Sequence, residues 1–297
     1  MPNRIYDTAP LSPVTPLTIN IKGHLFNFSC PWVMGIINVT PDSFYEGSRT
    51  EYLSDVRLRV RTMRNAGAQC VDIGGYSSRP GASEVSADEE YRRLATGLEA
   101  VRLEWPEAVV SVDTFRAGVA RRCVEEWGAD IINDISGGTL DPAMGETVAS
   151  LRVAYVLMHM RGTPADMQKH TCYGDVVADV IRDLAFKADT LRNLGVADII
   201  IDPGFGFAKT VEQNYRLLAC LGEFRRLGCP ILAGLSRKSM IWRPLGITPA
   251  EALPGTVALD TVALLNGADI VRVHDVDEAV QTVKVLQLLR DSEIHTI

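Results

Sequence analysis

The sequence has no excess of basic residues. Its 30 Lys and Arg are outnumbered by 37 Asp and Glu, which gives a formal charge of −7. General nucleic-acid binding needs a basic face, and no cluster of Lys and Arg along the chain suggests one. We therefore expect no nucleic-acid partner, and any anionic substrate has to be held by local groups.

The sequence also lacks a long apolar run. No segment approaches the roughly 20 apolar residues of a membrane span. Residues 1–16 do not show the order of charged and then apolar residues that is typical of a signal peptide. We therefore expect a soluble protein in the cytoplasm that makes no contact with a membrane.

Cysteine motifs are absent as well. The six cysteines form no CxxC pair and show no regular metal-ligand spacing. Several of them lie inside apolar patterns, so we expect them to be reduced and mostly structural. They are Cys30, Cys70, Cys123, Cys172, Cys220 and Cys229.

What the chain does have is enough apolar material for a large core. It has 297 residues, of which 46% are hydrophobic, and this length fits one large domain or two small ones. Residues 1–16 contain four prolines and little apolar periodicity, so we interpret them as a flexible leader. Residues 18–21 and 25–28 alternate around a turn at Lys22 and Gly23, which predicts a β-hairpin that could plug one end of a barrel.

Short β-branched runs recur from residue 32 onward, and each leads to a polar or charged residue. The first run stops at Asn38, where Pro41 and its polar neighbours cannot continue a central strand. The runs occupy residues 33–38, 70–75, 109–114, 131–134, 199–204 and 270–275. One such run means little, whereas six indicate strand ends that converge.

Helical patterns alternate with these strands. We expect helices at 53–66, 88–103, 116–127, 144–151, 176–194, 211–227 and 277–289, with a broken helical region at 239–266. Further strands at 154–160 and 230–235 bring the count to eight strand-helix units. Eight units over about 250 residues favour a closed (β/α)8 TIM barrel, an α/β fold, over an open doubly wound sheet. We therefore assign residues 17–297 to a single barrel domain with an N-terminal hairpin.

The active site of such a barrel lies at the carboxyl ends of its strands. Asp72, Asp113, Asn133 and Asp202 are expected there. Their oxygens could bind a metal, or they could accept hydrogen bonds from a flat heterocycle rich in N–H donors. One acid per strand suits the edge of a heterocycle better. The alternative is that these residues only cap helices or satisfy loop amides.

Two groups of cations are expected at the same end of the barrel. In the Ser-Arg-Lys-Ser segment at 236–239, Lys238 supplies a point charge and Arg237 a planar fork, and the helix that follows begins with free amides. This predicts a carboxylate or phosphate site. Arg272 and His274 lie two residues apart and so share one face of the last strand, which predicts a clamp for phosphate oxygens unless the histidine is structural.

Two long loops, 38–50 and 74–86, follow the first two barrel strands. They resemble mobile lids that complete a site when they close, and the alternative is that they are ordinary surface linkers.

Taken together, these segments resemble the dihydropteroate synthase family of the folate pathway. The resemblance covers nearly everything from the first strand to the eighth, and this many polar motifs in one order are specific. The motifs are Gly-Ile-Ile-Asn-Val-Thr-Pro-Asp-Ser-Phe at 35–44, Ser-Ser-Arg-Pro-Gly at 77–81, Leu-Met-His-Met at 157–160, Asp-Pro-Gly-Phe-Gly-Phe at 202–207, Ser-Arg-Lys-Ser at 236–239 and Arg-Val-His-Asp at 272–275.

The resemblance implies a (β/α)8 barrel that commonly forms a homodimer. It implies a transferase that joins 6-hydroxymethyl-7,8-dihydropterin pyrophosphate to p-aminobenzoate and releases pyrophosphate, with Mg²⁺ as the cofactor. The displacement is dissociative, so that pyrophosphate leaves first and the arylamine attacks a resonance-stabilised pterin cation.

The resemblance also assigns roles to single residues. The pterin would be surrounded by Asp72, Asp113, Asn133, Met158, Asp202 and Lys238. Asn38 would bind the Mg²⁺, and the pyrophosphate would be held by Arg272, His274 and Arg79. The p-aminobenzoate site, where sulfonamides compete, would consist of Phe44, Ser78, Pro80 and the amide of Ser239.

Both lid loops depart from the usual pattern of the family. Glu46 stands in place of a loop aspartate, and we expect it to join Lys238, Arg272 and His274 as a catalytic group that stabilises the pterin cation. In the second loop Tyr76 replaces the usual glutamate, and a serine replaces the usual threonine one residue before the loop arginine. These changes are expected to affect turnover and sulfonamide affinity more than pterin binding.

Two other interpretations remain open from the sequence. One is a catalytically silent paralogue that binds pterin, which the altered loops suggest. The other is a pterin-dependent methyltransferase domain, against which the Ser-Arg-Lys-Ser segment at 236–239 argues.

Overall fold

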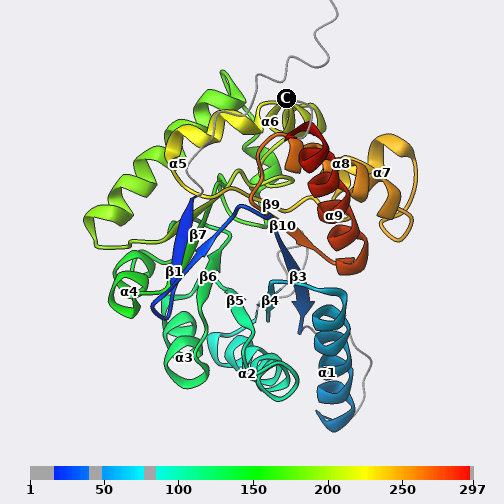
Figure 1. The fold of residues 1–297 in the computed structure, drawn as a ribbon. Helices are drawn as coiled ribbons and strands as arrows, with labels where there is room; N and C mark the ends of the chain where they lie inside the picture. Colours follow the sequence, from blue (N-terminus) through cyan, green and yellow to red (C-terminus); the bar gives the residue numbers. More distant parts are fainter. Residues whose placement is uncertain (1–16, 40–48, 77–84, 295–297) are drawn as a thin grey trace, which may run out of the picture.

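Eight parallel strands wind into a barrel, and helices form a ring around it (Figure 1). The computed structural model describes residues 17–39, 49–76 and 85–294. The barrel strands are β3 (Trp32–Asn38), β4 (Cys70–Gly74), β5 (Val109–Asp113), β6 (Ile131–Asp134), β7 (Ala154–Met158), β8 (Ile199–Asp202), β9 (Leu232–Ala233) and β10 (Ile270–Val273). They pair in the order β8-β7-β6-β5-β4-β3-β10-β9, and a parallel bridge between Ile201 and Ile231 closes the circle.

The outer ring is helical. Its α-helices are α1 (Arg49–Ala66), α2 (Ala87–Glu104), α3 (Ala117–Trp127), α4 (Met144–Leu151), α5 (Val176–Asn193), α6 (Val211–Ala219), α7 (Ser239–Leu245), α8 (Leu253–Leu265) and α9 (Val276–Ile294), with 3₁₀ turns η2 (Met167–Lys169) and η3 (Leu221–Leu227). Barrel strands are buried on both faces, one against the interior and one against the ring, which explains their continuous apolar sequence. The predicted (β/α)8 barrel is confirmed.

The N-terminal hairpin closes the bottom of the barrel. β1 (Thr18–Ile21) and β2 (His24–Asn27) are joined by Lys22 and Gly23, both with positive φ, as a tight hairpin turn requires. Ile19 and Ile21 pack among the inward side chains of the barrel. These barrel side chains are Met34, Cys70, Ile131, Ala154, Val156, Ile200, Leu232 and Ile270. The expected plug is therefore confirmed.

Polar contacts hold the hairpin at the amino-terminal ends of the strands. The amide of Asn20 donates to Asp198 Oδ1 at 2.8 Å, immediately before β8. Lys22 Nζ lies 2.6 Å from Asp130 Oδ1, immediately before β6. The hairpin therefore covers the bottom of the barrel. It does not cover the opposite mouth, where the carboxyl ends of the strands lie.

Most predicted helix ends agree with the structure. Ser86 caps α2 by accepting a hydrogen bond from the amide of Glu89, and Gly128 ends α3 with φ of 65°. The helix expected at 211–227 is wrong in one respect, because it divides into α6 and η3. Asn266 Nδ2 donates to the carbonyl of Leu218 at 2.8 Å and so takes an acceptor from the last turn of α6.

Two further predictions concern the leader at the start of the chain and the absence of a membrane span. The expected leader, residues 1–16, lies outside the described residues. Among the helices that the structure describes, none combines the length and the apolar composition that a bilayer crossing needs.

Candidate functional site

The predicted polar residues meet at the carboxyl ends of the barrel strands. Asn38, Asp113, Met158 and Asp202 are the last residues of β3, β5, β7 and β8, and His274 directly follows β10. A small cavity of about 40 Å³ lies at this mouth. It is lined by Asp113, Asn133, Ile135, Met158, Asp202, Phe207, Gly234, Lys238 and Arg272. Five of the residues predicted to surround a ligand therefore share one cavity with the predicted Arg272.

Arg272 is the centre of the polar network. Its Nε donates to Asp72 Oδ2 at 2.6 Å and its Nη2 to Asp113 Oδ2 at 2.9 Å. The amide of Asn133 also donates to Asp72 Oδ2, at 3.1 Å. Asp72 is fully buried and is not part of the cavity lining, so it lies below Asp113 and anchors Arg272 and Asn133 from beneath. Burial raises the pKa of Asp113, against the lowering effect of Arg272.

Asp202 lies across the cavity beside a lysine. Its Oδ1 accepts the amide of Gly204 at 2.7 Å. Burial raises the pKa of its carboxyl, and the charge of Lys238 is the largest opposing influence. Lys238 donates to the carbonyl of Phe205 and lies 5.0 Å from the ring centre of Phe207. Burial lowers the pKa of Lys238 to about 8, so the ammonium is still charged at neutral pH.

His274 is held by a serine from the neighbouring loop. Ser236 Oγ accepts the amide of His274 at 3.2 Å and lies 2.9 Å from its Nδ1. Burial, followed by the charge of Arg272, lowers the pKa of His274 to about 4, so the ring is neutral at neutral pH. When the hydroxyl donates to Nδ1, the ring proton is on Nε2 and remains available as a donor.

Arg237 does not contribute to the anion site that the sequence predicted at the mouth of the barrel. Its guanidinium forms a fork with both oxygens of Asp275, at 2.9 Å each, and donates to the carbonyls of Pro249 and Ala250. Its φ of 54° is uncommon for a residue with a side chain. Arg237 therefore ties the loop after β9 to the loop after β10, and the anion site expected of it is wrong.

The apolar wall of the cavity could not be read from the sequence motifs. Ile135 and Phe207 line the mouth beside the predicted Met158. Met160, Met167 and Ala208 are buried behind them in the same apolar cluster. Carboxylates combined with sulfur and aromatic groups in one cavity suit a flat polar heterocycle, as the sequence predicted for this mouth.

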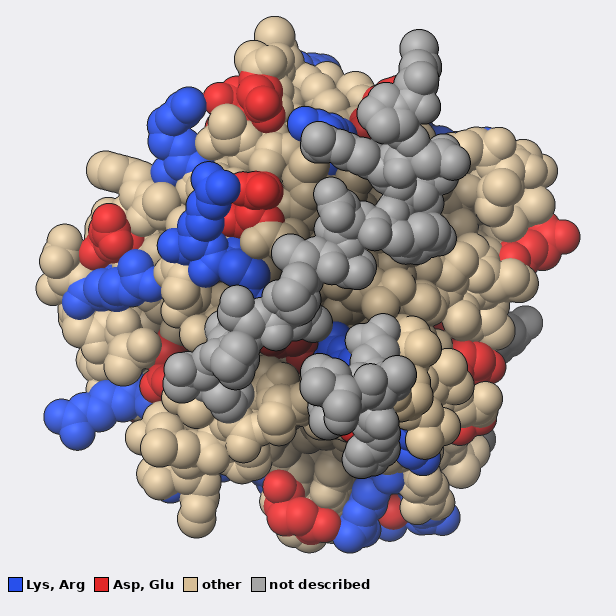
Figure 2. Space-filling model, turned by 45° about the horizontal axis from the view of Figure 1, so that its top comes forward, with Lys and Arg blue, Asp and Glu red and all other residues tan. Residues whose placement is uncertain are grey.

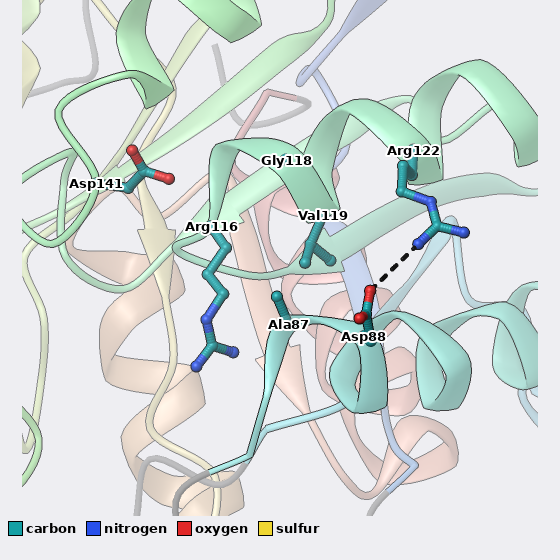
Figure 3. Close-up of a pocket in the computed structure, with 7 residues that line it drawn as sticks. All are labelled: Ala87, Asp88, Arg116, Gly118, Val119, Arg122 and Asp141. Carbon is teal, nitrogen blue, oxygen red and sulfur yellow. Dashed lines mark ion pairs between the residues drawn. The ribbon is translucent and has the colours of Figure 1, made fainter.

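A larger cavity of about 360 Å³ lies elsewhere, between the beginnings of α2 and α3 (Figure 3). Its lining residues are Ala87, Asp88, Arg116, Gly118, Val119, Arg122 and Asp141, and none of them lines the mouth. Arg122 forms an ion pair with Asp88 across it, at 3.9 Å. Arg116 pairs with Glu90 and Asp141 accepts the amide of Ala117, so the polar groups of this cavity have structural partners, and we assign the chemistry to the smaller cavity at the mouth.

The lid residues cannot be placed. Phe44, Glu46, Ser78, Arg79 and Pro80 lie outside the described residues, so their predicted roles stay predictions. Ser239 is the first residue of α7, directly after Lys238, as expected.

Tyr76, at the start of the second loop, packs edge-on against Phe115 with ring centres 5.4 Å apart. The guanidinium carbon of Arg116 lies 4.7 Å from the centre of the Phe115 ring, and Arg116 Nη2 donates to the carbonyl of Val85 at 2.8 Å. Arg116 therefore links both ends of the second loop to the start of α3.

A divalent cation would find oxygen ligands beside β3. A Cβ built on Gly74 would lie 3.6 Å from Asn38 Oδ1 and 3.8 Å from Asp113 Oδ2, so both oxygens face the same small space. Within the described part of the chain, no three His, Cys, Asp or Glu side chains form a metal cluster. A single amide oxygen fits Mg²⁺, which keeps several waters and often relies on substrate phosphates for the rest of its shell.

On the face turned forward in Figure 2, Lys and Arg lie among Asp and Glu and form no continuous basic surface.

Comparison with known proteins gives a consistent result. A family model described as "pterin binding enzyme" matches residues 34–274. The chain is similar to the dihydropteroate synthase of Synechocystis, with 45% identity over 261 residues that cover 87% of this chain and 90% of the relative. It is also similar to the dihydropteroate synthase of Escherichia coli K12, with 42% identity, 90% of this chain and 94% of the relative.

Solved structures agree with these relatives. The dihydropteroate synthase of Yersinia pestis, in complex with a sulfonamide drug, has a TM-score of 0.86 and 38% identity, covering 93% of this chain and 100% of that chain. The dihydropteroate synthase of Xanthomonas albilineans with 4-aminobenzoic acid has a TM-score of 0.85 and 38% identity, covering 93% of this chain and 99% of that chain.

Proposed function

The chain belongs to the family of pterin-binding enzymes, and we infer that it is a dihydropteroate synthase. It is a transferase of folate biosynthesis that condenses 6-hydroxymethyl-7,8-dihydropterin pyrophosphate with p-aminobenzoate to give 7,8-dihydropteroate and pyrophosphate. One observation of the site supports this above all others. The mouth of the barrel joins carboxylates and an amide, which suit the donors of a pterin, to cations that suit a departing diphosphate.

The pterin would occupy the cavity at the mouth. We propose that Asp202 accepts two hydrogen bonds from its guanidine-like edge, while Asp113 and Asn133 contact the other polar edge. Met158 and Phe207 would pack on the faces of the ring.

Arg272 and His274 would hold the diphosphate. A guanidinium has five donors, and Asp72 and Asp113 take one each, so further N–H groups of Arg272 remain for phosphate oxygens. His274 would contribute as a neutral Nε2–H donor, because its lowered pKa leaves it uncharged. Lys238 would add positive charge at the same mouth.

The reaction needs charge stabilisation more than a nucleophile. The bond between the pterin methylene and the diphosphate oxygen breaks, and the electron pair leaves with the diphosphate. The amine of p-aminobenzoate then attacks the methylene and loses a proton. Cations at Arg272 and Lys238 stabilise the leaving group, while the carboxylates offset charge on the pterin cation. Glu46, outside the described residues, is proposed for the same task.

Magnesium is proposed as the cofactor. Asn38 would hold Mg²⁺ through its Oδ1, together with oxygens of the diphosphate, and the ion would neutralise charge on the leaving group.

The arylamine site is proposed beside the start of α7. Ser239 would offer its amide, and Phe44, Ser78 and Pro80 would contribute from the loops once these close. Sulfonamides compete for this site. Because the diphosphate has to be in place before the loops close, p-aminobenzoate is expected to bind detectably only when pterin pyrophosphate or pyrophosphate is present.

We propose that the protein forms a homodimer through α8 and α9, which pack side by side (Figure 1). Their outer faces carry apolar side chains with large exposed fractions, namely Val262 at 38%, Leu265 at 53%, Val285 at 63%, Leu288 at 70% and Leu289 at 50%. Exposed apolar side chains on two helices that contact each other are typical of an isologous interface. The cytoplasmic location stays a prediction from the sequence.

Two measurements together test the function. Calorimetry with 6-hydroxymethyl-7,8-dihydropterin pyrophosphate should show binding, and a coupled assay should show pyrophosphate release that depends on p-aminobenzoate. Binding without release would identify a silent pterin-binding protein. The absence of both would contradict the assignment altogether.

A further inference from the structure

Lys209 is a buried cation that the proposed reaction does not use. It is 3% exposed and lies between β8 and α6. Its Nζ donates to the carbonyls of Gly204 at 2.8 Å and Phe207 at 2.9 Å, and it lies 3.1 Å from His159 Nδ1. Burial, followed by the charge of Lys209, holds the pKa of His159 far below its usual range, so this ring is neutral and accepts. The three donors of the ammonium are therefore all used.

These bonds fix the turn that presents Asp202. The amide of Gly204 donates to Asp202 Oδ1 at 2.7 Å, while its carbonyl accepts from Lys209. Gly204 has a φ of 72°, and a Cβ here would stand 2.0 Å from the carbonyl oxygen of His159. The turn is thus pressed against the end of β7, and Phe207 from the same turn lines the mouth.

Charge links the same residues. After burial, which raises the pKa of Asp202, the charges of Lys238, Lys209 and Arg272 lower it. Burial lowers the pKa of Lys209 to about 7, and the nearby Asp202 opposes this shift. The other charged groups that act on Lys209 are Lys238, Arg161 and Asp183, and those that act on His159 are Lys209, Lys187 and Arg161.

We propose that Lys209 is a positioning residue of the pterin site, which fixes the turn that presents Asp202 and supplies positive charge that keeps Asp202 ionised. This inference rests on the proposed function, because an ionised Asp202 matters only for a ligand with a guanidine-like edge. Lys209 acts from behind the carboxylate and lines no part of the cavity. Its loss should therefore change how pterin affinity depends on pH.

The test uses the full chain with Lys209→Met and 6-hydroxymethyl-7,8-dihydropterin, which carries no diphosphate. Its affinity is measured by calorimetry between pH 6 and pH 8. Without the charge the pKa of Asp202 rises, so the loss of affinity should be roughly tenfold larger at pH 6 than at pH 8. Near pH 8 Lys209 of the wild type is largely neutral, so the loss of affinity that remains there reports the hydrogen bonds to the turn.

Asn214→Ala is the matched control. Asn214 is 2% exposed, accepts the amide of Gly206 at 2.7 Å and donates to the carbonyl of Thr210 at 2.7 Å, so it holds the same turn without a charge. Its loss of affinity should be equal at both pH values. Lys209→Arg should keep the affinity of the wild type at pH 6, where both side chains are charged, and serves in case Lys209→Met does not fold.

Two results would overturn the inference. Lys209→Met could lose the same factor at pH 6 and pH 8, as the Asn214 control does, or Lys209→Arg could lose as much affinity at pH 6 as Lys209→Met. Either result would leave the proposed function intact. A wild-type protein that binds no dihydropterin at any pH would overturn the proposed function, and the inference with it.

Discussion

Among single residues, Asp202 makes the most specific demand on its ligand. Its Oδ1 already accepts the amide of Gly204, so an asparagine could keep that bond only by presenting its NH₂ group to the pterin. Asp202→Asn should therefore abolish measurable dihydropterin binding, because donor would face donor. Calorimetry checks the affinity and a thermal melt checks the fold. An affinity within about twofold of the wild type would refute the role given to Asp202.

Lys238 should set the alkaline limit of activity. Burial lowers its pKa to about 8, with Asp202 and Asp113 opposing and Arg272 adding to the shift. The protonated ammonium is the form that stabilises the leaving group, so kcat/KM should fall as pH rises through about 8. Lys238→Met should lower kcat/KM at pH 7 by at least roughly tenfold and remove the alkaline limb. An unchanged limb in this variant would assign the titration to another group.

Asp260 should make stability fall with rising pH. It is 2% exposed, and its Oδ1 has no hydrogen-bond partner in the described structure. Burial, followed by the charge of Asp275, raises its pKa to about 8. Between about pH 4 and pH 8 the native state thus binds more protons than the unfolded state, and the free energy of unfolding decreases with a slope approaching ~1.4 kcal/mol per pH unit.

The variant Asp260→Asn removes this titration. It should raise the melting temperature at pH 8 more than at pH 5, whereas Asp55→Asn on the exposed face of α1 should change neither value much. Equal effects of Asp260→Asn at the two pH values would show that Asp260 does not titrate in this window.

The site residues that the sequence predicted share one physical origin. Four predicted residues lie at or near the carboxyl ends of apolar runs, and a closed parallel barrel brings such ends together: Asp72, Asp113, Asn133 and Asp202. Ile135 and Phe207 could not be singled out, because an apolar side chain that lines a cavity looks like any core residue. The contacts of Lys209 depend on a turn, and those of Arg237 depend on an unusual backbone conformation. Residue spacing reveals neither feature.

At the scale of elements, the hairpin should stabilise the barrel by filling its bottom. Ile19 is 1% exposed among the inward side chains, so Ile19→Ala should leave a cavity and cost roughly 2–5 kcal/mol in unfolding free energy. Leu25→Ala, on the same hairpin but 72% exposed, should cost less than about 0.5 kcal/mol. Denaturant titrations of both variants measure the difference. Similar small losses would mean that the hairpin does not act as a plug.

Element positions followed well from local sequence, except where a distant residue intervenes. Periodicity placed α4 at Met144–Leu151 without error, and β10, Ile270–Val273, begins where the predicted run at 270–275 begins. The strand expected at 230–235 shrinks to β9, Leu232–Ala233, although Ile231 still bridges to Ile201. This strand and the divided helix at 211–227 depend on pairing with remote residues, which no local pattern contains.

At the scale of the whole molecule, the apolar face of α8 and α9 predicts a dimer of two 32.5 kDa chains. Val262→Glu or Leu288→Glu should place charges in the interface and give a monomer in analytical ultracentrifugation. Phe186→Glu is the control, because Phe186 is 74% exposed on α5, which α6 separates from α8 in the ring (Figure 1). A wild-type monomer, or a dimer that withstands both substitutions, would contradict the proposed interface.

The proposed function depends on one reaction, which joins a pterin to an arylamine at the barrel mouth. The most direct test incubates the protein with 6-hydroxymethyl-7,8-dihydropterin pyrophosphate, p-aminobenzoate and Mg²⁺, and measures 7,8-dihydropteroate by mass spectrometry and pyrophosphate by a coupled assay. We expect equal amounts of 7,8-dihydropteroate and pyrophosphate. A sulfonamide should suppress the formation of both, and Asp202→Asn should form neither. Pterin binding without dihydropteroate under saturating substrates would contradict the proposed function.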